Sequence, residues 1–468
     1  MTVTIEALAA LTGARLVAAG PDRPHAPQAS LRRGGVDSRA ACADSLFVAL
    51  AGSRADGHDF LADAFAAGAA AALVADRQWQ ARGAALQAVA RRYRATLAVV
   101  DDPLQALHRL AEAHRSQSEA ERVAVTGSSG KTTTRRILAS ILKQCAPTYE
   151  AERNYNSVIG LPLALLGIEP RHRMAVLELG IDYRGEMDVL GRLAAPHHAL
   201  ITAIGTAHLA AFESRATIAA EKARVLAHLP RGGHAFVPES EELLIRSRLP
   251  LPPEVALVRF GPTTTKGYEG SESLGFDGST IHWEGLQIHF PLFGNHNVAN
   301  VLAAITVATT LGVSAAAIKR GIEAMEAVAG RSQVIRGRLT IVNDAYNANP
   351  ESMAAALTFL ADLPDRGRVL VVLGSMLELG SATQAAHAAL AEVIAAADPD
   401  AVFLFGAETA ATAHALQASG FGRPVLWTTF YAELEAAVIE SVRAGDTVLL
   451  KGSRGVALDR LVAPLQAA

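Results

Sequence analysis

The chain has 468 residues, of which 50% are hydrophobic and 19% are charged, a composition that excludes a disordered protein. A length of about 150 residues per domain predicts roughly three domains. The net charge is −3 and no long basic run appears in the sequence, which argues against sequence-independent binding of nucleic acid.

The cysteines and the apolar segments exclude two further classes. Cys42 and Cys145 lie far apart and form no CxxC motif, so we expect neither a disulfide scaffold nor a zinc knuckle, and a reducing cytoplasm fits. The N-terminus shows no basic segment followed by an apolar core, so we expect no signal peptide. The most apolar stretch, residues 64–75, is too short to span a bilayer. We therefore expect a cytoplasmic chain without membrane insertion.

Residues 1–100 are expected to form a first α/β domain. Short strand-like pieces, LFVAL, AALVA and LAVV, alternate there with alanine-rich helical stretches. The sequence DDP at residues 101–103 ends this segment because Asp and Pro favour turns, and residues 104–114 are predicted to form a helix.

Residues 101–329 are expected to form a central domain, whose first strand leads into the glycine-rich sequence TGSSGKTTT at residues 126–134. The Walker A template G-x-x-x-x-G-K-[ST] requires a glycine at position 125, where this chain has Val125. An apolar strand precedes the loop and an amphipathic helix follows it, which is the setting that a phosphate-binding loop requires. The alternative is a simple glycine turn followed by an exposed lysine.

In the phosphate-binding interpretation, the loop residues have separate chemical roles. Backbone N–H groups point at an anion near the helix N-terminus, Lys131 adds a positive charge, and Thr132 or Thr133 offers a hydroxyl to Mg²⁺. The predicted phosphate-binding residues are Thr126, Gly127, Ser128, Ser129, Gly130, Lys131, Thr132 and Thr133.

Three more candidate site residues follow in the central domain. Strands are predicted at residues 174–180 and 198–205 with helical stretches between them, which indicates a parallel α/β sheet. Glu178, at the C-terminal end of the first strand, is either a Mg²⁺ ligand or a solvated strand-end residue. His208 follows the second strand and is either a metal-site residue or a structural histidine. Lys222 lies on a predicted helix, where its local pattern favours a surface lysine.

The end of the central domain has a different pattern. Residues 276–292 alternate like antiparallel strands, and a helix is predicted over residues 297–312. The sequence GNHNVAN at its start either reads the edge of an adenine or caps the helix.

Residues 330–468 are expected to form a third, Rossmann-like domain. Its predicted strands are LTIVNDA, RVLVVLG, AVFLFG and TVLLKG, separated by helical stretches. Because no G-x-G-x-x-G follows any of these strands, the fold alone implies no dinucleotide. Two polar clusters, NDAYNANPESM and KGSRG, come directly after strands, and the second suits an anion. Arg331, at the domain junction, either reaches a phosphate or forms a hinge salt bridge.

No nucleophile motif such as G-x-S-x-G accompanies the phosphate loop. The loop therefore implies transfer of a phosphoryl group to a substrate. The proteins that do this are kinases, NTPase switches and ligases that activate a carboxylate.

Together, these residues resemble the Mur ligase family along essentially the whole chain. The family's loop has the form TG[TS][NS]GKT, which residues 126–132 match. Four stretches, VDSRAACADSLFVALAGSRADGHDF, NYNSVIGLPLALL, NDAYNANPESM and LGSMLELG, are most similar to members that join D-alanyl-D-alanine to UDP-N-acetylmuramoyl-tripeptide. The resemblance implies an α/β fold of three domains: an N-terminal UDP-substrate domain, a central P-loop ATPase-like parallel-sheet domain and a C-terminal Rossmann-like domain.

The resemblance also implies the cofactors ATP and Mg²⁺ and the roles of individual residues. Thr132, Glu178 and His208 match the metal positions, and Lys222 matches a lysine that several relatives carry as a carbamate. The expected nucleotide contacts beyond the loop are Asn295, Asn297, Asn300, Arg331 and Asp344. The expected substrate contacts are Ser38, Arg39, Asp56, Gly57 and His58 for the UDP-sugar, Asn154, Asn156 and Ser157 in the NYNS stretch, and Tyr346, Asn347 and Asn349 for D-alanyl-D-alanine.

Two positions depart from the family pattern. Ser375 stands where LGDMLELG usually has Asp, and Leu458 stands where Met is common, so we expect Leu458 to pack in its place. The implied mechanism transfers the γ-phosphoryl group of ATP to the tripeptide carboxylate, and the dipeptide amine attacks the resulting acyl phosphate. The alternatives are a nucleotide-gated binding module, which the loss of an acid at Ser375 motivates, and a ligase of the same family that adds a different amino acid or polyglutamate. A monomer is expected.

Overall fold

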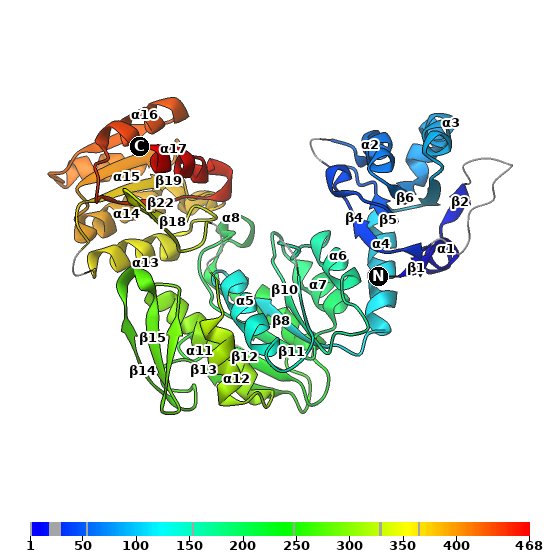
Figure 1. Ribbon diagram of the computed structural model, residues 1–468, viewed down its shortest axis with the longest axis horizontal. Coiled ribbons are helices and arrows are strands. Elements are labelled where there is room, and N and C mark those ends of the chain that lie inside the picture. The colour runs from blue at the N-terminus through cyan, green and yellow to red at the C-terminus, as the bar shows by residue number, and fades with distance from the viewer. Residues whose placement is uncertain are drawn as a thin grey trace. The chain divides into compact units, whose positions relative to one another are not determined.

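The computed structural model describes residues 2–17, 30–52, 55–151, 154–246, 249–326, 330–363 and 366–468 (Figure 1). The chain divides into two compact units. The first consists of Met1–Ala124, Ala146–Gly180 and Asp188–His198, and the second of Val125–Cys145, Ile181–Met187 and Ala199–Ala468. Residue 329, at the predicted boundary of the third domain, lies outside the described residues. None of the described helices has both the length and the apolarity needed to cross a membrane.

The N-terminal part of the first unit is a five-stranded sheet in the order β2-β7-β6-β5-β4. Neighbouring strands are parallel except for β2 and β7, which are antiparallel. Helices α2 and α3 pack on the sheet through Leu61, Phe65 and Leu86, which are buried with Phe47 of the central strands. These elements span β2 Arg15–Val17, β4 Arg33–Gly35, β5 Ser45–Val48, β6 Ala69–Ala75, β7 Thr96–Val100, α2 Leu61–Ala66 and α3 Asp76–Tyr93.

A second, six-stranded sheet has the order β13-β12-β11-β8-β10-β9. Residues Val123–Val125 of its strand β8 are a run of buried apolar residues, as expected for a strand that is covered on both faces. Both β9–β10 and β12–β13 are parallel pairs. The strands span β8 Glu121–Thr126, β9 Thr148–Glu150, β10 Met174–Glu178, β11 His198–Ile201, β12 His234–Pro238 and β13 Ala256–Phe260.

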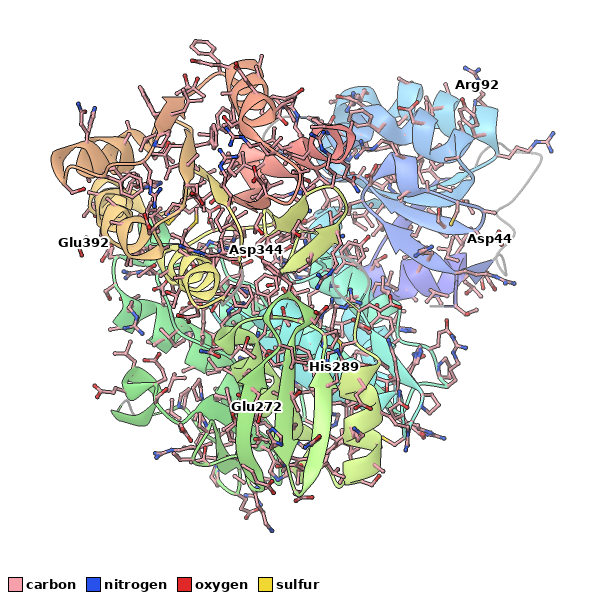
Figure 2. The ribbon with its side chains drawn as sticks, turned by 60° about the vertical axis from the view of Figure 1, so that its left-hand side comes forward. Asp44, Arg92, Glu272, His289, Asp344 and Glu392 are labelled. Carbon is pink, nitrogen blue, oxygen red and sulfur yellow. The ribbon has the colours of Figure 1, made fainter. Side chains whose placement is uncertain are left out.

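Helix α5 (Lys131–Leu142) follows β8 and is the helix predicted after the glycine-rich loop. Its apolar residues Ile137, Leu138, Ile141 and Leu142 are all buried, which confirms the predicted amphipathic face. Helices α11 (Asn295–Thr310) and α12 (Ala315–Glu323) pack against α5. The antiparallel strands predicted over residues 276–292 form two strands of a three-stranded sheet, on which Figure 2 labels Glu272 and His289. Its first strand, β14, lies before the predicted range. Its strands are β14 Tyr268–Ser273, β15 Ser279–Trp283 and β16 Leu286–Phe290.

The C-terminal part of the second unit is the predicted Rossmann-like domain. Its sheet has the order β17-β18-β22-β19-β20-β21, in which only β17 is antiparallel to its neighbour. Helices α13, α14 and α15 cover one face of the sheet, and α16 and α17 cover the other (Figure 1). These elements span β17 Gln333–Arg336, β18 Thr340–Asn343, β19 Val369–Gly374, β20 Ala401–Phe405, β21 Val425–Thr428, β22 Thr447–Lys451, α13 Pro350–Ala361, α14 Thr383–Ala397, α15 Ala410–Ala418, α16 Tyr431–Ser441 and α17 Val462–Ala467.

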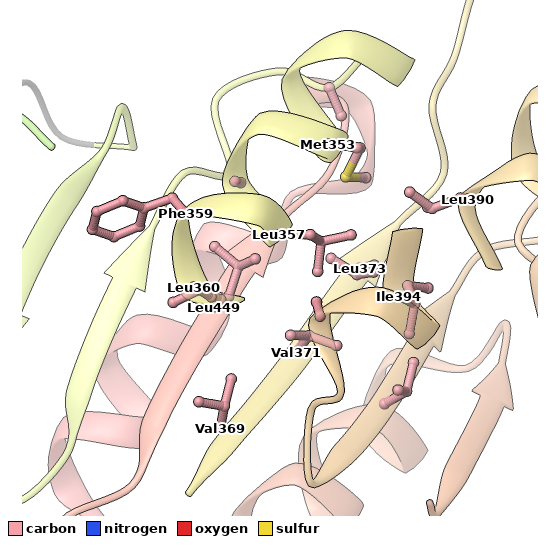
Figure 3. Close-up of a cluster of buried hydrophobic side chains, with 14 of the residues drawn as sticks. Met353, Leu357, Phe359, Leu360, Val369, Val371, Leu373, Leu390, Ile394 and Leu449 are labelled. Carbon is pink, nitrogen blue, oxygen red and sulfur yellow. The ribbon is translucent and has the colours of Figure 1, made fainter. Parts of the chain in front are cut away.

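Each face of this sheet has its own core. On one face, Leu357 of α13 and Ile394 of α14 pack on Val371 of β19 (Figure 3). On the other face, Leu458 is completely buried, which confirms its predicted packing role. Each such buried aliphatic side chain contributes about 1.5–3 kcal/mol to folding.

The structure corrects the ends of several predicted elements. The strand predicted at 198–205 ends at Ile201, and the strand predicted at 174–180 ends at Glu178. The helix predicted at 297–312 begins at Asn295 and ends at Thr310. After both strands the apolar pattern continues beyond the last regular hydrogen bond, because Leu179 and Ile204 are still buried.

Candidate active site

The glycine-rich loop joins β8 to α5 and depends on both of its glycines. Gly127 and Gly130 have positive φ values of 152° and 76°, which side-chain-bearing residues rarely adopt. A side chain at Gly127 would collide with the hydroxyl of Thr202, and one at Gly130 would collide with the amide oxygen of Asn300. These two constraints explain why the loop needs glycine at 127 and 130.

The residues that follow β11 hold the loop in place. The Thr202 hydroxyl donates to the carbonyl of Ser129 at 2.5 Å, and the Ser128 N–H donates to the carbonyl of Ala203 at 2.8 Å. The Lys131 ammonium donates to the carbonyl of Gly127 at 2.7 Å, so it lies across the loop where an anion would bind. Thr202 was not predicted as a site residue, because its role depends on a contact between distant segments.

Asn297 and Asn300 are buried and connect the loop to the C-terminal domain. Asn300 accepts from the Thr134 hydroxyl at 3.1 Å and donates to Asn297 at 3.1 Å. Asn297 in turn donates to the carbonyl of Phe293 at 2.8 Å and to the Ser332 hydroxyl at 3.4 Å. The N-cap of α11 is Gly294, the first residue of the motif, and none of the motif's side chains caps the helix.

The same network continues to Asp344, which Figure 2 labels. Its carboxylate accepts from the Ser332 N–H at 2.9 Å and from the Lys451 ammonium at 2.5 Å. Lys451 also donates to the carbonyl of Asn347 at 3.3 Å. Asp344 therefore links the chain after the domain junction to the ends of β18 and β22.

Asn295 has a different environment from the two buried asparagines. It lines a cavity of about 730 Å³ at the N-terminus of α11, together with Phe276 and Phe359. An ion pair between Arg336 and Asp277, 2.6 Å long, lies on the same wall. The cavity therefore combines flat apolar walls with polar groups, a composition typical of small-molecule sites.

Lys222 is completely buried on α9 (Arg215–Ala223), with 1% of its surface exposed, so the surface-lysine alternative is wrong. Burial lowers the pKa of its ammonium well below the usual value, and the positive charge of Lys131 lowers the pKa further. The carboxylates of Asp182 and Glu221 act in the opposite direction. Glu221 is held in turn by the N–H groups of residues 185 and 187, at 2.9 and 3.0 Å.

Glu178 and Asn156, both in the first unit, are in direct contact. Glu178 is 3% exposed, which rules out a solvated strand-end residue, and it accepts from the Asn156 amide at 2.9 Å. The Asn156 carbonyl accepts from the Gly180 N–H at 2.8 Å and its N–H donates to the carbonyl of Asn154. Ser157 accepts from the N–H of Gly160 at the start of α6 (Gly160–Leu166).

His208 has a left-handed backbone, with φ of 63°, in the loop after β11. Its Nδ1 atom lies 2.7 Å from a carboxylate oxygen of Glu378 and 3.5 Å from one of Asp182. Among the described residues, no group of three His, Cys, Asp or Glu side chains is arranged to hold a metal ion. Mg²⁺ requires no such group, because it binds through one or two carboxylates, substrate phosphates and water. The buried carboxylate of Glu178 and the buried hydroxyl of Thr132 are donors that fit this chemistry.

Arg331 stacks on an aromatic ring. Its guanidinium carbon lies 3.9 Å from the ring centre of Tyr346, and that of Arg454 lies 5.8 Å from the same centre. Within the described residues Arg331 forms no ion pair, so the hinge salt bridge gains no support from the structure. Asn349 caps α13 by accepting from the Ser352 N–H at 2.8 Å. Its side chain is thus committed to the helix.

The predicted UDP-sugar residues form two small polar clusters in the first unit. Ser38 and Arg39 lie in a short helix, and Arg39 makes a bidentate pair with Asp37 at 2.9 and 2.8 Å. Asp56 accepts from His58 Nδ1 at 2.6 Å, while Nε2 of the same ring accepts from the Ala75 N–H. This fixes the tautomer of His58, with its proton on Nδ1. Gly57 packs so closely on Leu50 that a side chain would not fit.

Ser375, which replaces the family's usual Asp, is buried at the end of β19. Its hydroxyl donates to the carboxylate of Glu408 at 2.6 Å. This hydrogen bond is the main cause that holds the pKa of Glu408 below its usual value. A carboxylate is therefore present at this edge of the sheet, supplied by a residue that the sequence motifs did not indicate.

Three family models match consecutive segments of this chain. The Mur ligase family, catalytic domain matches residues 34–115, the Mur ligase middle domain matches 125–308, and the Mur ligase, glutamate ligase domain matches 330–454.

Among proteins similar in sequence are three named UDP-N-acetylmuramoyl-tripeptide–D-alanyl-D-alanine ligase. The one from Treponema pallidum is 36% identical, with 91% of this chain and 92% of that protein covered. Those from Escherichia coli and Bacillus subtilis are 35% and 33% identical, with 92% of each chain covered.

Solved structures agree with this relationship. A crystal structure of MurF from Acinetobacter baumannii has a TM-score of 0.83 at 29% identity and covers 100% of this chain and 99% of that one. MurF from Thermotoga maritima in complex with ADP has a TM-score of 0.74 at 25% identity, over 93% and 97% of the two chains. The fold is the three-domain α/β fold of these proteins, and the chain belongs to the Mur ligase family.

Proposed function

We propose that this chain is an ATP-dependent ligase that joins D-alanyl-D-alanine to the C-terminal carboxylate of UDP-N-acetylmuramoyl-tripeptide, giving a pentapeptide precursor of peptidoglycan. One observation carries the proposal. The chain is 36% identical over 91% of its length to a ligase of that name, and it completely buries a lysine, Lys222, whose pKa the phosphate-loop lysine, Lys131, helps to lower. An ordinary NTPase loop has no need of a second, buried amine.

The reaction has two steps. The γ-phosphoryl group of ATP passes to a carboxylate oxygen of the tripeptide, which gives an acyl phosphate and ADP. The dipeptide amine then attacks the acyl carbon and loses a proton, and the C–O bond breaks to release phosphate. The first step brings two anions together, so positive charge from Lys131 is required to hold them in line.

We propose that Thr132, Glu178 and His208 are the metal-site residues. When bound, Mg²⁺ supplies positive charge that screens the phosphates from the attacking carboxylate. The loop residues 126–133 hold the phosphates through their backbone N–H groups, and Arg331 and Asp344 complete the nucleotide site from the C-terminal side. Asn295 is the adenine contact that the cavity at α11 supports, while Asn297 and Asn300 hold the loop from behind.

We propose that Lys222 acts as a carbamate. A lowered pKa leaves a larger fraction of the amine neutral, and only a neutral amine attacks CO₂. The nitrogen forms a bond to the CO₂ carbon and loses a proton, which gives an anion in place of a cation. A buried anion beside Lys131 would remove the repulsion between the two lysines and provide oxygen ligands for Mg²⁺.

The remaining roles concern the substrates. We propose that the UDP-sugar is bound by two segments, one with Ser38 and Arg39 and the other with residues 56–58. We also propose that residues 154–157 contact the substrate near Glu178. Tyr346 and Asn347 would shape the dipeptide pocket, with Asn349 placing them by capping α13. We further propose a cytoplasmic monomer.

The test is phosphate release by the purified protein with ATP, Mg²⁺ and UDP-tripeptide. Release that depends on added D-alanyl-D-alanine is the expected result. Release driven instead by single amino acids would overturn the substrate assignment in favour of another ligase of the family. No release with any amine, while ATP still binds, would leave only a nucleotide-gated binding module.

A further inference from the structure

The loop that carries His208 is held by two glutamates of the C-terminal domain. This segment, residues 202–213, is called the His208 loop; it leads from β11 toward α9 within the second unit and includes the four-residue helix α8 (Leu209–Phe212). The N–H and the hydroxyl of Thr206 each donate to a different carboxylate oxygen of Glu351, both at 3.0 Å. Glu351 lies in the first turn of α13, two residues after the Asn349 cap. One carboxylate therefore accepts from two donors of Thr206, which precedes His208 by two residues in the sequence.

The second glutamate, Glu378, contacts His208 itself. Its carboxylate lies 2.7 Å from His208 Nδ1, and its carbonyl accepts from the Ala210 N–H at 3.1 Å. Gly380 packs against the backbone of Ala210 so closely that a side chain would lie 2.8 Å from the Ala210 Cα atom. His208 and Glu378 both have left-handed backbones, with φ of 63° and 66°. Residues hold this conformation when surrounding contacts require it, and such residues concentrate at functional sites.

The two glutamates belong to loops that are joined to each other. The Ser453 hydroxyl accepts from the Leu377 N–H at 2.9 Å and donates to the carbonyl of Ala348 at 3.4 Å. The Ser453 N–H donates to the carbonyl of Ser375 at 3.1 Å. The loops NDAYNANPESM and LGSMLELG are thus connected through KGSRG, and Glu351 and Glu378 extend from this connected group to the His208 loop.

From this geometry we infer that Glu351 and Glu378 are positioning residues, which place the His208 loop for phosphoryl transfer and make that placement depend on the dipeptide-binding loops. The inference rests on the proposed function. Glu378 fixes the orientation of the imidazole through Nδ1, as second-layer carboxylates do for histidines at metal sites. Glu351 fixes the backbone at Thr206, two residues before His208. Both carboxylates are exposed, and exposed pairs of this kind add little to overall stability. Their loss should therefore change turnover without unfolding the protein.

The variants Glu378→Gln and Glu351→Gln test this, with Glu392→Gln on α14 as a matched control, because Glu392 is an exposed glutamate of the same domain (Figure 2). We expect each site variant to lower kcat about tenfold. The KM for UDP-tripeptide, the Kd for Mg-ADP and the Tm should stay unchanged, as should every parameter of Glu392→Gln. The double variant should lose less than the product of the two single losses, because both residues act on one loop.

Hydrogen exchange provides a readout that is independent of activity. The amides of Thr206 and Ala210 should exchange faster in the site variants than in the unchanged protein, with no other region affected. An unchanged kcat together with unchanged exchange would overturn the inference. A loss of kcat in a variant whose Tm also falls would overturn it too, because it would indicate that the glutamate supports the structure in general. If the unchanged protein lacks ligase activity, the proposed function fails, whereas the exchange result still decides whether the glutamates hold the loop.

Discussion

Lys222 is the residue whose position departs furthest from its local sequence. The sequence AAEKARVL predicts a lysine on the exposed face of a helix, yet the structure buries this side chain completely. Its surroundings come from other segments, since Asp182, Glu186 and Lys131 all shift its pKa. Local periodicity contains no information about such partners, and only the resemblance to a family indicated a role for this lysine.

The carbamate role gives a prediction for the variant Lys222→Ala. Ligase activity should fall at least about 100-fold, because the variant has no side-chain amine and so cannot form the negatively charged carbamate. Short carboxylic acids such as acetate or propionate, added to the assay, should restore part of the activity by filling the space left by the side chain. The measurement is the rate of dipeptide-dependent phosphate release as a function of acid concentration.

Lys131→Ala is the matched control for this rescue. It removes a cation from the neighbouring position, so added carboxylates should not restore its activity. Full activity of Lys222→Ala without any acid would show that the carbamate idea is wrong.

At the scale of elements, the close packing of α12 on α5 supports the phosphate loop. Gly321 lies in the last turn of α12, where a Cβ atom would clash with the backbone of Ile141, and its carbonyl accepts from the Ser140 hydroxyl at 2.6 Å. Glycine is unfavourable within a helix, so its presence here reflects close approach of the two helices rather than helix propensity.

Gly321→Ala should therefore destabilise the protein, although alanine is the better helix former. Pushing α12 away from α5 should lower the free energy of unfolding by about 1–3 kcal/mol, which is the usual cost of overpacking. Denaturant unfolding of the variant measures this change. Gly422→Ala is the control, since Gly422 has open space around it and should show no change. A Gly321→Ala protein as stable as the original would mean that the helices separate at no cost.

Elements were easier to predict than their contacts. The strand before the loop, the apolar face of α5 and the four inner or buried strands β18, β19, β20 and β22 of the C-terminal sheet follow from local patterns of apolar residues. The edge strands β17 and β21 were not predicted, because their residues are mostly half-buried or exposed. The roles of Thr202 and Asn300 could not be predicted in this way, because each holds the loop from a segment far along the chain. The motif GNHNVAN shows the limit clearly. Its three asparagines look alike in sequence, yet one lines a cavity and two are buried.

At the scale of the whole molecule, the residues proposed to bind the nucleotide phosphates and those proposed to bind the UDP-sugar belong to different units of the chain. The loop with Lys131 belongs to the second unit, whereas Ser38, Arg39 and Asp56 belong to the first. The variant Lys131→Ala should therefore abolish product formation while the Kd for UDP-tripeptide, measured by calorimetry, stays within about twofold, since sites without shared partners usually behave independently.

Lys266→Ala provides the comparison, because Lys266 is an exposed lysine of the same unit and its loss should change neither quantity. Continued ligation by Lys131→Ala would refute the assignment of the loop. A joint loss of ligation and of UDP-tripeptide binding would indicate that the two sites are not separate.

The contact between Ser375 and Glu408 changes how sequences of this kind should be compared. A comparison position by position counts Ser375 as the loss of an acid, although a carboxylate lies 2.6 Å from its hydroxyl. An aspartate at 375 would face that carboxylate, and two like charges at such a distance cannot both ionise readily. Positions 375 and 408 are therefore best compared as a pair. An acid at one of them, after β19 or after β20, goes with a neutral hydrogen-bonding residue at the other. Relatives with Asp in this motif should carry a neutral residue at the position equivalent to 408.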